Sequence, residues 1–89
     1  IDHRRVANLM TFFKRQRKAL PVTTNPADYR PGDIVAWELP GSRLHIGLVS
    51  DLPVSGSKRR AVIHNIGAGT QAEDVLFAWK VLGHYRVFR

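Results

Sequence analysis

Apolar residues near the start of the chain recur every three or four positions, which is the spacing of one helix face. They are Val6, Leu9, Met10 and Phe13. Basic residues take most of the opposite face, Asp2 can cap the first turn, and Pro21 cannot continue a helix. The pattern predicts an amphipathic helix over residues 3–20.

A connector without apolar periodicity follows at residues 21–32. It contains Pro21, Pro26, Pro31, Asn25 and Asp28. Proline, asparagine and aspartate each favour turns. We therefore expect this connector to lie on the surface.

The rest of the chain, residues 33–89, is typical of strands. Ile, Val and Trp are concentrated in 33–39, 44–50 and 60–66, with turn-forming residues between them. Residues 74–82 fit either a strand or a short helix, and 83–88 fit a last strand. We predict an α+β fold in which residues 1–89 form one N-terminal amphipathic helix and a four- to five-stranded antiparallel sheet. One helix covers little of such a sheet, so an exposed apolar face would indicate that further chain completes the domain.

The net charge of the chain indicates the charge of a possible partner. The chain has 14 Lys and Arg against 7 Asp and Glu, a net charge of +7, which attracts anionic molecules. Nucleic acid, anionic lipid head groups and acidic cell-wall polymers all qualify. The chain has no cysteine, which excludes a disulfide, a thiolate metal site and a thiol nucleophile among these residues. No apolar run reaches the roughly 20 residues of a membrane span.

Two histidines on neighbouring predicted strands are the candidate catalytic residues. Strand alternation places His45 and Gly47 on one face, where the missing Cβ of Gly47 leaves room beside the imidazole. His64 is near the end of the next strand, and antiparallel pairing brings it beside His45. A nucleophile needs a base, and that base needs a polar group to fix its tautomer. The pair fits these two roles, although His45 alone also fits a packed sheet residue.

The remaining candidates are weaker. We expect His3 and His84 at the surface. A zinc site from His45, His64 and Asp51 matches no compact ligand motif, so we predict no metal and no cofactor. Basic residues interleaved with aromatic ones would favour nucleic acid, but only residues 85–88 come close. Nucleic acid is therefore not the partner that we expect.

Three segments carry a resemblance: 31–37 (PGDIVAW), 44–51 (LHIGLVSD) and 62–65 (VIHN). In order and residue type they resemble the second half of NlpC-type cell-wall peptidases, which are papain-like. The resemblance implies that the chain is the second half of a papain-like domain, with His45 and His64 as catalytic residues. Either His64 or Asn65 could orient His45, since the stretch between the histidines is longer than is usual in those peptidases.

A closer resemblance covers nearly the whole chain. Segments 1–6 (IDHRRV), 64–69 (HNIGAG) and 83–86 (GHYR) look like the C-terminal half of a bacterial domain-of-unknown-function family, number 1287. In that family an upstream half carries a Cys-Thr-Asp segment at the start of a helix, and this cysteine would be the nucleophile. Its members are typically exported, which implies a periplasmic or cell-envelope location.

Two functions follow. The resemblance implies the histidine-bearing half of a cysteine hydrolase that cuts a peptide or amide bond in the cell envelope. That half is inactive alone and partners the upstream half of the same domain or a second copy. The charge keeps open a non-catalytic basic domain that binds an anionic polymer, cell-wall or nucleic acid. This domain would use its basic helix face and Lys58, Arg59 and Arg60.

Overall fold

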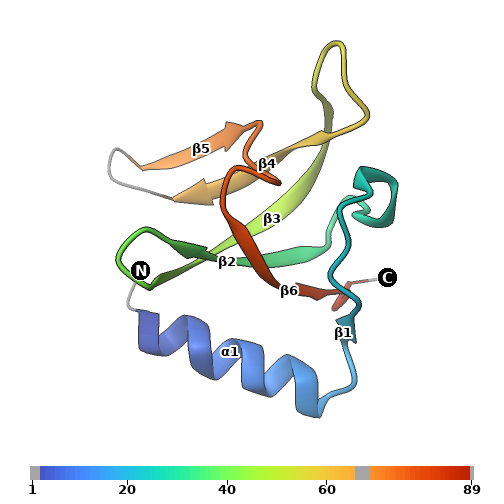
Figure 1. The fold of residues 1–89 in the computed structure, drawn as a ribbon. Coiled ribbons are helices and arrows are strands. Elements are labelled where there is room, and N and C mark those ends of the chain that lie inside the picture. The colour runs from blue at the N-terminus through green and yellow to red at the C-terminus, as the bar shows by residue number, and fades with distance from the viewer. Residues whose placement is uncertain (1–2, 66–68, 89) are drawn as a thin grey trace.

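The computed structural model describes residues 3–65 and 69–88 and shows one helix against a single antiparallel sheet (Figure 1). The elements are α1 (His3–Arg15), β1 (Ala19–Leu20), the 3-10 helix η1 (Pro26–Asp28), β2 (Ile34–Leu39), β3 (Arg43–Pro53), β4 (Arg60–Asn65), β5 (Thr70–Glu73) and β6 (Lys80–Tyr85). The strands pair in the order β1-β6-β2-β3-β4-β5. The α+β class is confirmed, with six strands in place of the predicted four or five. Asp2, the predicted cap, lies outside the described residues.

The two additional strands gave no apolar pattern. β1 has only two residues and lies inside the segment predicted to be helical. β5 is exposed along its whole length and polar at three of its four positions. The ambiguous segment 74–82 contains a turn and then the start of β6, which ends at Tyr85. Pairing with neighbouring strands, rather than local hydrophobicity, therefore makes these segments extended.

The helix ends five residues earlier than predicted. Arg17 has a left-handed φ of 58°, the Lys18 N–H donates to the Phe13 carbonyl at 2.9 Å, and the Arg17 N–H donates to the Lys14 carbonyl at 3.1 Å. These two bonds form a Schellman motif, in which a left-handed residue satisfies the last helix carbonyls. The backbone closes the helix before Pro21 is reached.

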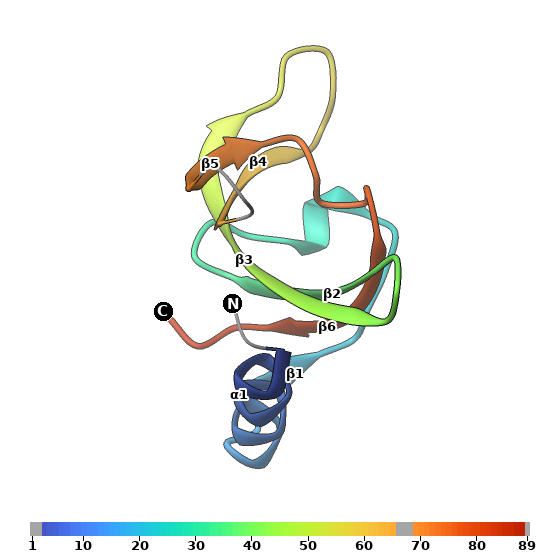
Figure 2. The same cartoon turned by 90° about the vertical axis from the view of Figure 1, so that its left-hand side faces the viewer.

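The curved sheet has a different cover on each face (Figure 2). One face holds the main core, which is built from Tyr29, Val35, Trp37, Leu39, Val49, Val62 and Leu76. On the other face α1 packs Phe13 against Ala36 and Tyr85. Beside it an apolar groove of about 320 Å³ stays open, lined by Ile34, Ile46, Gly47, Leu48, Ile63 and Phe88. One helix therefore leaves part of this face uncovered, as we expected.

Gly47 lets the Trp37 side chain lie across β3. Trp37 is fully buried, and its Nε1–H donates to the Leu76 carbonyl at 2.9 Å. A Cβ on Gly47 would lie 2.6 Å from Cη2 of Trp37 and 2.7 Å from Cγ1 of Val62. The space that we expected beside His45 for a helix or a substrate is thus filled by the indole, and that prediction is wrong.

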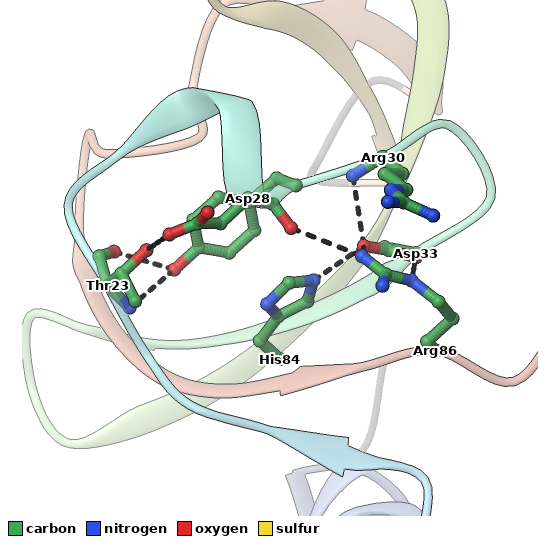
Figure 3. Close-up of polar contacts among 7 residues, drawn as sticks. Thr23, Asp28, Arg30, Asp33, His84 and Arg86 are labelled. Carbon is green, nitrogen blue, oxygen red and sulfur yellow. Dashed lines mark hydrogen bonds and ion pairs between the residues drawn. The ribbon is translucent and has the colours of Figure 1, made fainter.

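Asp33, His84 and Arg86 join the start of β2 to the end of β6 (Figure 3). The Asp33 carboxylate accepts hydrogen bonds from His84 Nε2 at 2.6 Å and from Arg86 Nε at 3.0 Å and Nη2 at 2.8 Å. The His84 ring stacks on Tyr29 with centroids 4.2 Å apart, and His84 is only 1% exposed. The predicted surface position of His84 is therefore wrong. Its partners, Tyr29 and Asp33, precede β2 and lie about fifty residues away in the chain.

This cluster, which we call the Asp33 clamp, shifts the ionisation of its carboxyl group. Burial by itself would raise the pKa of Asp33. Hydrogen bonds from Arg86, His84 and the Arg30 N–H outweigh burial, and the pKa of Asp33 falls below its usual value. The clamp is therefore strongest with Asp33 ionised.

Asp33→Asn should lower the free energy of unfolding at pH 7 by about 3 kcal/mol, because it removes the buried charge that Arg86 and His84 share. The folded pKa of Asp33 lies below the unfolded one. Its contribution is therefore complete above about pH 4 and is lost as the pH falls through the folded value. Urea unfolding between pH 7 and pH 2 should show this loss in the wild type and not in the variant. The exposed Asp51 provides the control Asp51→Asn, and a stable Asp33→Asn protein would rule out the clamp.

Gly47→Ala should destabilise the fold by about 1–3 kcal/mol, because the new methyl group overlaps Trp37 and Val62. Trp37→Phe removes the ring atoms nearest to Gly47, so the alanine should cost less in that background. Urea unfolding of the two single variants and the double variant measures the difference. Equal costs in both backgrounds would show that Trp37 does not need this glycine.

Candidate active site

The two predicted catalytic histidines lie side by side in the sheet. β3 supplies His45 and β4 supplies His64, and the register pairs Gly47 with His64, so that the histidines are diagonal neighbours. His45 Nε2 and His64 Nδ1 are 2.9 Å apart, and their ring planes meet at 78°. The residues are 5% and 3% exposed. A buried hydrogen bond between imidazoles thus links the strands; the catalytic role remains a prediction.

His64, and not Asn65, is the partner of His45. Strand alternation turns Asn65 away from the pair, and Asn65 is exposed. Both open alternatives for the orienting residue were neighbours in the sequence, so the direction of the side chain decides between them.

Glu73 extends the pair to a third strand. Its Oε1 is 2.8 Å from Nε2 of His64, and its side chain is 49% exposed. β5 supplies Glu73, which pairs in register with Val62 and so lies diagonally from His64. The sequence analysis missed Glu73, because β5 carried no strand signal and the contact depends on its pairing with β4.

Two tryptophans pack against the histidine pair. Trp37 stacks on His45 with centroids 5.6 Å apart at 24°. Trp79 meets both imidazoles edge to face, with centroids 5.9 Å from His45 and 5.9 Å from His64. The two indole centroids are only 5.5 Å apart, so both rings pack on the same side of the imidazoles, where they fix the ring planes and displace water.

Burial in these surroundings lowers the proton affinity of His45. Burial lowers the pKa of His45 below its usual value, and the neighbouring His64 and Arg43 act in the same direction. His45 is therefore neutral at pH 7. Its Nε2 is engaged by His64, and no residue in the described part of the chain bonds to its Nδ1. Nδ1 is the nitrogen with which this ring can accept a proton.

The surroundings give no metal centre. Among residues 3–65 and 69–88, no three His, Cys, Asp or Glu side chains are grouped so as to hold a metal ion. Asp51, weighed above as a zinc ligand, is exposed and lies six residues beyond His45 on β3, about 20 Å at the usual strand rise. No helix in the described part of the chain is long and apolar enough to cross a membrane.

Comparison with known proteins supports the resemblance to family 1287 over most of the chain. Residues 1–87 match the family described as Domain of unknown function (DUF1287). The chain is 56% identical over 88 residues to Uncharacterized protein YijF of Escherichia coli (strain K12), and the match covers 99% of this chain and 42% of that relative. The chain thus spans less than half the length of this relative. No solved structure matches it. Because the family match spans residues 1–87, this chain belongs to the DUF1287 family.

Proposed function

We propose that this chain is the histidine-bearing half of a papain-like cysteine hydrolase that cuts a peptide or amide bond in the cell envelope. The observation that carries this proposal is the contact of His45 Nε2 with His64 Nδ1 at 2.9 Å. It leaves a neutral, enclosed imidazole with one nitrogen held and the other available. That is the arrangement of a general base beside a nucleophile.

In the proposed reaction His45 takes the proton of a cysteine thiol at Nδ1, and the thiolate attacks the carbonyl carbon of the substrate. The imidazolium then gives its proton to the leaving amine. Water then hydrolyses the resulting thioester with His45 as the base, and His64 holds the ring in the orientation that presents Nδ1. The cysteine would lie outside these residues, which contain none.

Two observations support a larger catalytic domain. The YijF relative is more than twice as long as the matched region, which covers 42% of it. The groove beside α1 exposes Ile46, Leu48 and Ile63 on one sheet face, and the other part of the domain would cover such an apolar surface. The NlpC-type relationship itself, and with it the periplasmic or envelope location, rests on the resemblance of segments 31–37, 44–51 and 62–65.

The native polypeptide should be markedly heavier than the 10.1 kDa of these residues and should contain a reactive cysteine. Intact mass of the protein from its host, followed by alkylation with iodoacetamide across the pH range, measures both. His45→Ala should slow alkylation at pH 6–7 about tenfold or more, because an unassisted thiol is only a few per cent thiolate there.

Asn65→Ala is the matched control, since Asn65 adjoins His64 but faces away from the pair, and it should leave the alkylation rate unchanged. A mass near 10.1 kDa with no cysteine-bearing partner, or equal rates in the His45→Ala protein, would contradict the proposal.

The second candidate is a non-catalytic domain that binds an anionic polymer. It is favoured by the net charge of +7 and by exposed cations along the helix, namely Arg4, Arg5, Lys14 and Arg15. The predicted contribution of Arg59 is reduced, because its guanidinium pairs with Asp74 at 2.8 Å. Tyr85 is buried against Phe13, so it offers no surface on which a base could stack.

Under the hydrolase proposal, binding of this chain to polyphosphate should be weak and should disappear near 0.15 M salt, where exposed charges are largely screened. Fluorescence anisotropy with labelled polyphosphate measures it. Tight binding that persists at this salt concentration, and that Arg5→Glu weakens, would favour the polymer-binding domain.

A further inference from the structure

We propose that Glu73 is a positioning residue of this site, which commits the proton shared by the two histidines to His45 Nε2 and thereby leaves His45 Nδ1 as the basic nitrogen. The contacts that join Glu73, His64 and His45 do not depend on the proposed function. Its catalytic meaning does, since a base is needed only where a nucleophile approaches His45.

The three side chains form one continuous line across three strands. His45 on β3, His64 on β4 and Glu73 on β5 are joined by contacts of 2.9 Å and 2.8 Å. Each link runs diagonally by two register positions in the same sense, from the partner of Gly47 and from the partner of Val62. The sheet therefore aligns these residues through its own pairing, and no loop is needed to bring them together.

If both imidazole rings are neutral, only one assignment of donors and acceptors satisfies the two hydrogen bonds along this line. A carboxylate has no hydrogen to donate, so Nε2 of His64 must donate to Glu73. The neutral His64 ring then has a lone pair at Nδ1, which can only accept. His45 must therefore donate from Nε2, and its own lone pair falls on Nδ1. The acceptor at the far end of the line thus sets the tautomer of the base.

The negative charge of Glu73 has a second effect. When His45 takes up a proton, the positive charge lies two hydrogen bonds from the carboxylate, beside the rings of Trp37 and Trp79. Attraction across such a partly buried path is stronger than in water. Glu73 therefore favours the protonated form of His45 and offsets part of the cost of its burial.

The first test is a nitrogen-15 NMR measurement of the imidazoles at neutral pH in the native polypeptide that contains these residues. His45 Nε2 and His64 Nε2 should carry hydrogen, and the Nδ1 atoms of both rings should not. A shared proton on His64 Nδ1, or hydrogen on His45 Nδ1, would overturn the inference. This measurement needs no variant, no cysteine and no substrate.

The second test is the pH at which the His45 ring signal titrates. Glu73→Gln keeps a carbonyl acceptor and removes the charge, so the tautomers should persist while the pKa of His45 falls by about 0.5–1 unit. Asp51→Asn removes the same charge about 20 Å along β3 and should cause no shift. Equal titration of the Glu73→Gln and Asp51→Asn proteins would overturn the role of the charge.

These results separate the inference from the proposed hydrolase. Shifted titration together with an unreactive native cysteine would leave Glu73 positioned as described and remove the hydrolase. Reactive cysteine with unshifted titration would do the reverse.

Discussion

The pairing register of β3 with β2 and β4 decides where every side chain of the candidate site points. Trp37 pairs with His45, and Gly47 pairs with His64. Because side chains alternate between the faces of a sheet, a slip of one residue would turn His45 towards α1 and Ile46 into the core. The hydrogen bond between the histidines, the stacking of Trp37 on His45 and the bare Cα of Gly47 under the indole all require this one register.

The Asp33 clamp aligns β2 with its other neighbour, β6. It fixes the first residues of β2 to the last residues of β6 through a buried carboxylate with several donors. A buried ion pair of this kind contributes less to stability than its distances suggest, because desolvation opposes the attraction. An alignment of β2 and β6 that separated these groups would leave a buried charge without a partner. The two polar clusters of the fold thus differ in purpose: the clamp involves ionised groups, whereas the histidine pair is built around a neutral ring.

Local patterns in the sequence were enough to predict that α1, β2, β3 and β4 exist, because each of these elements buries an apolar face with its own period. They were also enough to place His45 and His64 on adjacent strands, since a hairpin joins β3 to β4. The start of β6 and the whole of β1 depend on partners far along the chain, and the same is true of the burial of His84. β5 pairs with the preceding strand β4, but its polar, exposed residues give no strand signal. The end of α1 at Arg15 depends on a left-handed Arg17, a conformation that glycine signals and arginine does not. Glu73 was beyond reach for a related reason, because its role arises only when β5 is already paired with β4.

The line from Glu73 to His45 runs from solvent into the protein interior. Glu73 is half exposed, His64 is buried, and His45 is buried against two indole rings. The charge of Glu73 costs little desolvation energy because it lies at the exposed end of the line. Its hydrogen bond nevertheless orients His45 through His64. A carboxylate buried directly beside His45 would cost more desolvation energy. A carboxylate in direct contact with His45 would also raise the proton affinity of that ring more strongly. With His64 between Glu73 and His45, the hydrogen bonds still orient His45, while the carboxylate raises the pKa of His45 less. A buried imidazole that is to act as a neutral base requires both.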